Sequence, residues 1–180
     1  SSHRKKDKRK DNRNSLVGRF GEIAVGLNAE FVVMENVPDL LTKKHWKHYK
    51  SFAETLSSAG YKISAKIINM AEYGVPQERY RAVVLASRSG YPIFPKPSFD
   101  RQSFRTVREA IGHLTALSPY GGKDEKDPMH ITSRHRKETV ENIKKVPLNG
   151  GSRPRGVGPA CLDRVEGFYD VYGRLHWDKP

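Results

Sequence analysis

The sequence contains little cysteine and no long apolar run, and each shortage excludes a class of protein. A single cysteine, Cys161, excludes an intramolecular disulfide framework and a multi-cysteine zinc site. No run approaches the roughly 20 apolar residues of a bilayer-spanning helix, which excludes a membrane protein. The start of the chain is basic with no apolar stretch behind it, unlike a secretory signal. We therefore expect an intracellular protein.

Basic residues dominate the charge of the chain. Lys and Arg number 33 against 20 Asp and Glu, so the formal net charge is +13 over 180 residues. Such an excess predicts a polyanionic partner, most simply nucleic acid. Residues 1–13 hold seven basic residues against two acids and are too polar to fold alone. This segment is either a solvated tail or a loop that closes over an anionic ligand.

The first half of the chain has the pattern of an α/β sheet. Apolar spacing predicts two helices and three strands, at about 14–28, 31–34, 45–59, 61–70 and 81–87. The run at 31–34 is unbroken and apolar, which is typical of a strand buried on both faces. The last two strands are linked too briefly for a crossover helix, so we expect them to be antiparallel. These strands alone make an incomplete sheet.

The second half is less regular. Residues 91–97 form a Pro-rich linker, and a capping box at Thr106–Glu109 predicts a short helix. A further helix is expected at about 133–146, followed by Gly- and Pro-rich irregular backbone. We expect the chain to divide into residues 1–90 and 91–180.

Glu35 is the first candidate for chemistry. It follows the most apolar predicted strand, and open α/β sheets bind ligands at the carboxyl ends of their strands. We expect its carboxyl group to be partly desolvated, which favours the neutral acid. The alternative is a strand-end acid that caps a neighbouring loop.

The segment Gln77–Arg81 is the second candidate. In an extended strand, Gln77, Arg79 and Arg81 would share one face. Two guanidinium groups and an amide in a row can bind a phosphate and the polar edge of a base. The alternative is a solvated face of an edge strand.

Metal binding and cysteine chemistry are not expected. His45 and His48 lie on a Lys-rich helix with no cysteine nearby, and two imidazoles do not make a structural zinc site. Cys161 has no evident base or helix N-terminus to activate it, so we interpret it as a small buried hydrophobic residue.

Four stretches, in this order, resemble motifs of the DNA cytosine-5 methyltransferase family. They are Asp11-Asn12-Arg13-Asn14-Ser15-Leu16, then Glu35-Asn36-Val37, then Gly74-Val75-Pro76-Gln77-Glu78-Arg79-Tyr80-Arg81, and finally Gly150-Gly151-Ser152-Arg153 with Tyr172-Gly173-Arg174-Leu175. The third stretch is the most specific, and the resemblance covers essentially the whole chain. It implies a partial Rossmann-like methyltransferase sheet in residues 1–90 and part of a small, irregular target-recognition domain in residues 91–180.

The resemblance also implies a reaction, the transfer of a methyl group from S-adenosylmethionine to carbon 5 of a flipped cytosine in double-stranded DNA. Glu35 would donate to ring nitrogen 3, which eases addition of a thiolate to carbon 6. Arg79 and Arg81 would hold the exocyclic oxygen and the adjacent phosphate. Asn36 and Gln77 would order the loop. Such an enzyme of restriction-modification would lie in the cytoplasm with the nucleoid if the source is prokaryotic.

Further contacts are implied for the first 16 residues. Leu16 would lie against the adenine of the cofactor. The basic segment that contains Arg4, Lys5, Lys6 and Arg13 would correspond to the family's mobile loop over the DNA.

Two parts of the family pattern have no counterpart in this sequence. These are the glycine-containing loop that binds S-adenosylmethionine and the Pro-Cys-Gln segment that supplies the thiolate. We therefore expect a fragment that is inactive alone and works with the remaining methyltransferase portion, in cis or as a separate chain. The alternatives are a non-catalytic DNA-binding subunit of a split methyltransferase and a self-sufficient enzyme that uses Cys161.

Overall fold

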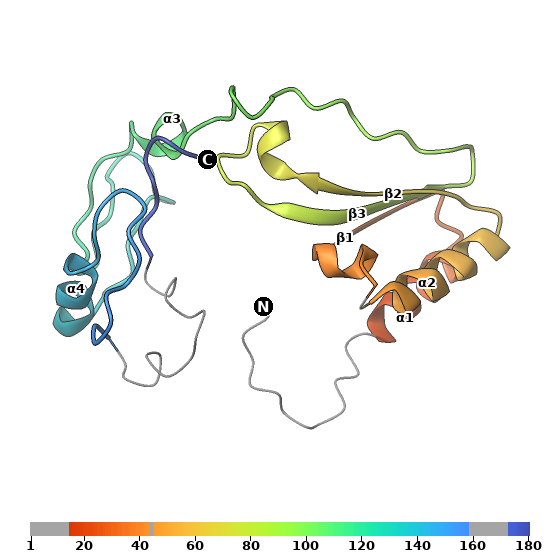
Figure 1. The fold of residues 1–180 in the computed structure, drawn as a ribbon, viewed down its shortest axis with the longest axis horizontal. Helices are drawn as coiled ribbons and strands as arrows, with labels where there is room; N and C mark the ends of the chain where they lie inside the picture. The colour runs from red at the N-terminus through yellow and green to blue at the C-terminus, as the bar shows by residue number, and fades with distance from the viewer. Residues whose placement is uncertain (1–14, 44, 159–172) are drawn as a thin grey trace. The chain divides into compact units, whose positions relative to one another are not determined.

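The computed structural model describes residues 15–43, 45–158 and 173–180. The chain divides into two compact units (Figure 1). The first comprises residues 1–73 and 79–98, and the second comprises residues 74–78 and 99–180. A short excursion at 74–78 therefore belongs to the second unit although both flanking segments belong to the first. No helix in the described ranges is long and apolar enough to cross a membrane.

A three-stranded antiparallel sheet forms the centre of the first unit. Its strands are β1 (Phe31–Asn36), β2 (Lys62–Asn69) and β3 (Tyr80–Ser87), in the order β1-β3-β2. The predicted α/β class is confirmed, as is the antiparallel pairing of the last two strands. The pairing of β1 with β3 is also antiparallel. Because the described strands include no parallel pair, the Rossmann-like arrangement stays a prediction.

Two helices cover one face of this sheet (Figure 1). They are α1 (Ser15–Gly26) and α2 (Trp46–Ser58), both predicted from apolar spacing. Phe52 and Leu56 of α2 are fully buried against the inner face of β1 and β3, and the Phe20 ring of α1 stacks on that of Phe52. The chain leaves α2 through Gly60, whose φ of +88° favours glycine.

The prediction that β1 is buried on both faces is wrong. Its side chains alternate between buried and exposed, with Val32 and Met34 in the core. Phe31 and Val33 point to the other face and are 54% and 59% exposed. The helices that bury β1 lie on one side of the sheet only. The unbroken apolar run therefore places alternate side chains in the core and on the open face.

The second unit contains short helices joined by long irregular segments. The helices are α3 (Val107–Ile111), which starts with the predicted capping box, and α4 (Lys137–Lys144). The helix expected over 133–146 is therefore shorter than predicted. Val140 and Val146 are buried and form the apolar side of the α4 segment.

Candidate active site

The structure brings together two of the predicted motifs at one end of the sheet. Glu35 lies near the end of β1, and Arg81 lies near the start of β3, the neighbouring antiparallel strand. The Nε of Arg81 lies 2.6 Å from Oε1 of Glu35. The guanidinium group also donates from Nη1 to the carbonyl of Tyr80, at 2.7 Å. Two side chains that are 46 positions apart in the sequence thus form one ion pair.

The surroundings of this pair differ from the prediction for Glu35. The Glu35 side chain is 58% exposed, whereas that of Arg81 is 15% exposed. The predicted desolvation of the carboxyl group is therefore wrong for the described structure, because the outer face of β1 is uncovered. The ion pair fixes one carboxyl oxygen on a partly buried cation, and the open side leaves the group within reach of a ligand.

Asn36 and the turn after β1 support the position of Glu35. The side-chain oxygen of Asn36 accepts a hydrogen bond from the backbone N–H of Val37, at 2.8 Å. The chain then enters the 3-10 helix η2 (Pro38–Leu41), whose Leu40 is buried in the core. The Asn36 side chain therefore orders the first residue of the loop that follows Glu35.

Gln77 and Arg79 occupy different surroundings. β3 begins at Tyr80, so the predicted two-residue alternation does not extend from Arg81 back to Gln77. Gln77 lies in the 74–78 excursion, where its N–H donates to the carbonyl of Val75. Arg79 is exposed and lies where the chain re-enters the first unit. The prediction that all three residues share one strand face is wrong, because Gln77 and Arg79 both precede β3.

The structure adds Asn69, which the sequence analysis did not single out. It ends β2 and is 4% exposed. Its side-chain oxygen accepts hydrogen bonds from the N–H groups of Ala71 and Arg79, at 3.2 Å and 3.0 Å. The sequence signals Asn69 only by its position, directly after the apolar pair Ile67 and Ile68. A polar side chain there is expected to be buried, and a buried amide needs hydrogen-bond partners.

The remaining first-unit predictions are only partly covered by the described residues. Leu16, in the first turn of α1, is 62% exposed. Its exposed side chain can pack against a flat apolar group such as an adenine ring. This single contact does not by itself form a cofactor site. Arg4, Lys5, Lys6 and Arg13 lie outside the described residues.

The two predicted recognition stretches of the second unit pair with each other. The N–H of Gly150 donates to the carbonyl of Leu175 at 3.1 Å, and the N–H of Arg174 donates to that of Gly151 at 2.9 Å. A Cβ atom on Gly151 would lie 2.2 Å from the Pro147 carbonyl oxygen, so only glycine fits there. Cys161, between these stretches in sequence, lies outside the described residues.

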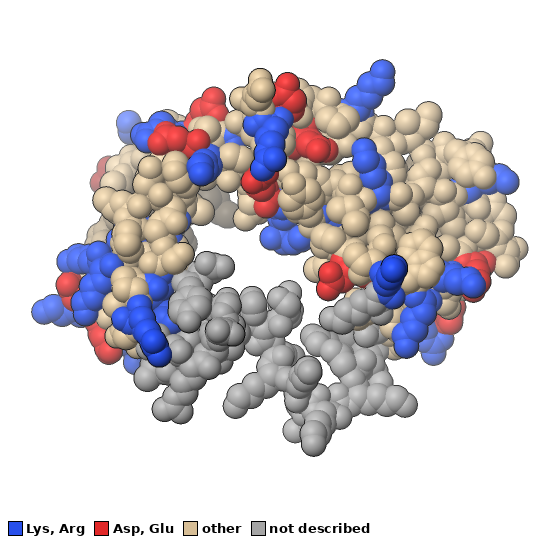
Figure 2. Space-filling model, viewed as in Figure 1, with Lys and Arg blue, Asp and Glu red and all other residues tan. Residues whose placement is uncertain are grey.

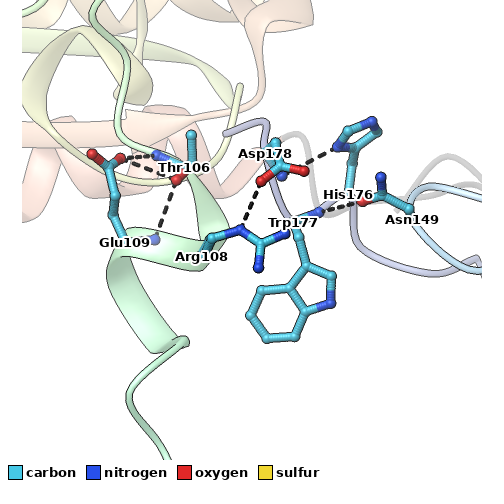
Figure 3. Close-up of polar contacts among 7 residues, drawn as sticks. All are labelled: Thr106, Arg108, Glu109, Asn149, His176, Trp177 and Asp178. Atoms are coloured by element: carbon cyan, nitrogen blue, oxygen red, sulfur yellow. Dashed lines mark hydrogen bonds and ion pairs between the residues drawn. The ribbon is translucent and has the colours of Figure 1, made fainter.

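A second set of contacts joins the start of α3 to the end of the chain (Figure 3). We call it the C-terminal junction, and it consists of Thr106, Arg108, Glu109, Asn149, His176, Trp177 and Asp178. Arg108 donates from Nε to Asp178 at 2.7 Å, and its backbone N–H donates to the carbonyl of Trp177. The side-chain oxygen of Asn149 accepts from the N–H of Trp177.

Hydrogen bonds in the C-terminal junction shift the pKa values of its charged groups, and each shift favours the ionised form. The hydrogen bond from Arg108 holds the pKa of Asp178 below its ordinary value and raises the pKa of Arg108. Hydrogen bonds from the backbone and side chain of Thr106 lower the pKa of Glu109 in the capping box. Both carboxyl groups are therefore stabilised in the ionised form.

Basic side chains are spread over the visible face of both units (Figure 2). The exposed basic residues in and next to α4 are Arg134, Arg136, Lys137, Lys144 and Lys145. Lys144 is engaged with Glu141 at 2.8 Å. The others contribute to a field that attracts polyanions.

Comparison with known proteins places these features in a family. The family model described as C-5 cytosine-specific DNA methylase matches residues 1–167. The Type II methylase M.HgiDII of Herpetosiphon aurantiacus is 31% identical over 168 residues, which are 91% of this chain and 47% of that protein. The Type II methyltransferase M1.HphI of Haemophilus parahaemolyticus is 34% identical over 171 residues, which are 94% of this chain and 44% of that protein.

The fold has a counterpart among solved structures. A crystal structure of a candidate DNA modification methyltransferase, encoded within an E. coli prophage, matches with a TM-score of 0.59 at 17% identity. The match covers 94% of this chain and 68% of that one. The chain spans a little under half the length of the two curated relatives described above. From the family match and the juxtaposed Glu35 and Arg81 motifs, we conclude that this chain belongs to the C-5 cytosine-specific DNA methylase family.

Proposed function

We propose that this chain forms part of a DNA cytosine-5 methyltransferase, in which Glu35, Arg79 and Arg81 contact a flipped cytosine. The observation that carries the proposal is the 2.6 Å ion pair between Glu35 and Arg81. It joins the Glu-Asn-Val motif to the Gln-x-Arg-x-Arg motif on neighbouring strands, on a face that is open to a ligand. Family membership supplies the reaction class.

In this proposal the ion pair orients the groups that meet the base. Arg81 holds Oε1 of Glu35, which leaves Oε2 for ring nitrogen 3 of cytosine. A proton shared between Oε2 and that nitrogen stabilises the charge that develops when a thiolate adds to carbon 6. Arg79, which is exposed and directly precedes β3, is available to the exocyclic oxygen or the neighbouring phosphate. Removal of the base from the stack costs a few kcal/mol, which these contacts offset.

The methyl donor and the nucleophile require more than the described residues. S-adenosylmethionine would supply the methyl group, and Leu16 offers one apolar contact to its adenine. The sequence has one cysteine, and its neighbours are Ala160 and Leu162 rather than Pro and Gln. We therefore propose that the thiolate comes from a further methyltransferase portion and that this chain alone transfers no methyl group.

The first unit has a surface suited to that further portion. β1 is an edge strand of the described sheet, so one side of its backbone is free to pair. Apolar side chains are also exposed on α1 (Leu16, Phe20 and Ile23) and on the face of β1 that the helices leave open (Phe31 and Val33). Exposed apolar side chains together with an unpaired strand edge are typical of an interface. The relatives are about twice as long as the matched region, which supports a partner portion of similar size.

Methyl transfer to DNA tests the proposal directly. Tritiated S-adenosylmethionine and unmethylated DNA of mixed sequence are incubated with the chain alone and with a polypeptide that carries the glycine loop and the Pro-Cys-Gln segment. We expect label in the DNA only in the second case. Glu35→Gln and Arg81→Met should each remove most of it. Glu54→Gln, which alters an exposed ion pair with Lys50 on α2, is the matched control and should retain it.

Affinity for DNA is tested by its dependence on salt. Phosphate contacts by the basic surface predict a linear fall of log K with log salt, with a slope of about −0.9 per neutralised phosphate. Fluorescence anisotropy with a mixed-sequence duplex measures the slope. A flat dependence would contradict the electrostatic argument.

The second candidate function is a DNA-binding subunit without a catalytic role, supported by the same open edge and basic surface. The substitutions separate the two proposals. In a catalytic role Glu35→Gln abolishes methyl transfer by the reassembled enzyme with DNA affinity retained. In a purely binding role it leaves the rate unchanged. In a prokaryotic cell either function would place the chain with the nucleoid.

A further inference from the structure

Asn69 lies at the base of the segment that carries the Gln-x-Arg-x-Arg motif. The chain leaves the first unit after Tyr73 and returns to it at Arg79. Asn69 makes hydrogen bonds on both sides of this excursion, to the N–H of Ala71 before it and to the N–H of Arg79 after it. One buried carboxamide therefore joins the outgoing and the returning backbone.

The returning backbone is also fixed by neighbouring bonds. The N–H of Met70 donates to the carbonyl of Arg79 at 3.0 Å, so the peptide groups on both sides of Arg79 are engaged. The β2–β3 ladder then pairs Asn69 with Tyr80 and Ile68 with Arg81. A slip of one residue in this ladder would turn the Arg81 side chain to the opposite face of the sheet.

We infer that Asn69 is a positioning residue that sets the start of β3, and through it the backbone of Arg79 and the place of Arg81 opposite Glu35. The inference rests on the proposed function only in naming these arginines as contacts of the base. The physical reason is the cost of a buried acceptor. At 4% exposure the Asn69 oxygen has little access to water, so the two backbone N–H groups must remain within its reach. That requirement restrains the Arg79 backbone relative to β2.

Nuclear magnetic resonance of the full chain tests the inference without DNA or cofactor. The observables are hydrogen-exchange protection of the Ala71 and Arg79 amides, protection of the Val84 amide within β3, and the Hε resonance of Arg81. In Asn69→Ala we expect protection at Ala71 and Arg79 to fall by about tenfold relative to Val84. The Arg81 Hε resonance should shift as its distance to Glu35 changes.

Two further variants distinguish positioning from a general loss of stability. Asn69→Asp keeps an oxygen that accepts both N–H groups and should restore the protection. Ile68→Val removes one methylene at the adjacent buried position and touches no hydrogen bond, so it should lower protection evenly, Val84 included. If Asn69→Ala does not fold, Asn69→Gln displaces the same carbonyl by one methylene and should show the same selective loss.

The inference is overturned if Asn69→Ala lowers protection evenly in the manner of Ile68→Val, or if the Arg81 Hε resonance does not move. Because neither observable involves methyl transfer, failure of the proposed function would leave this result unchanged. In the reassembled enzyme, the expected signature is a lower kcat for Asn69→Ala with an unchanged Kd for DNA.

Discussion

The ion pair between Glu35 and Arg81 predicts a measurable coupling between the two side chains. A double-mutant cycle with Glu35→Gln and Arg81→Met isolates it, because Gln is isosteric with Glu and Met retains the apolar part of Arg. The two atoms lie 2.6 Å apart, which favours a strong interaction. The carboxyl side is 58% exposed, and solvent therefore screens much of the attraction. We expect a coupling free energy of about 0.5–1 kcal/mol, at the upper end for exposed pairs.

The two single substitutions should differ in cost. Glu35→Gln removes the charge that faces a mostly covered guanidinium group, which then keeps the Tyr80 carbonyl and a neutral amide as its acceptors. Arg81→Met leaves a carboxylate that water already solvates. The polar part of the cost is therefore larger for Glu35→Gln.

Urea unfolding followed by tryptophan fluorescence measures the cycle. The chain has two tryptophans, Trp46 in the first unit and Trp177 in the second. A Trp177→Phe background leaves Trp46 to report on the unit that contains the pair. With m-values of about 1–3 kcal/mol per molar urea, the coupling shifts the midpoint by a few tenths molar. It should weaken as salt rises from about 0.05 M to 0.5 M. A coupling near zero at both salt concentrations would refute the geometric argument.

Three further predictions, the first with a matched control, test the structure. Gly74→Ala should destabilise the chain by about 1–2 kcal/mol in urea unfolding, because φ is +86° and the new methyl would lie 3.0 Å from the Phe99 ring. The matched control is Gly18→Ala inside α1, where the new methyl group would lie within 4 Å of no other atom. It should raise the free energy of unfolding by about 0.5–1 kcal/mol. Phe52→Ala should cost about 3–5 kcal/mol and unfold the first unit on heating, as followed by circular dichroism. Because the pKa of Asp178 is lowered, its ion pair stabilises the fold fully above the ordinary carboxyl pKa of about 4. This contribution is lost as pH falls through the lowered pKa. The fluorescence of Trp177 in the C-terminal junction should therefore change only in acid.

Local features of the fold are predictable because they depend on neighbours in sequence. The apolar spacing within 14–28 and 45–59 suffices for α1 and α2, since a helix buries one stripe of its own residues. The capping box at Thr106 and Glu109 is likewise contained in four residues. The brief link between β2 and β3 limits them to antiparallel pairing.

Features that depend on a neighbouring element are predicted less well. The apolar run of β1 gives no indication of how many of its faces are covered, and the structure covers one. The desolvation predicted for Glu35 fails for the same reason. Gln77 was expected to extend the strand that contains Arg81, but the start of β3 is fixed by contacts with β2.

The sequence by itself determined the helices, the strands, the excess of positive charge and the residue types of the candidate site. Only the tertiary structure decided which of these residues meet. Glu35 reaches Arg81 because β1 pairs with β3, and Asn69 reaches Arg79 because β2 ends where β3 begins. The pairing of β1 with β3 is a contact between distant segments, selected by the burial of a shared core, and no local pattern encodes that partner.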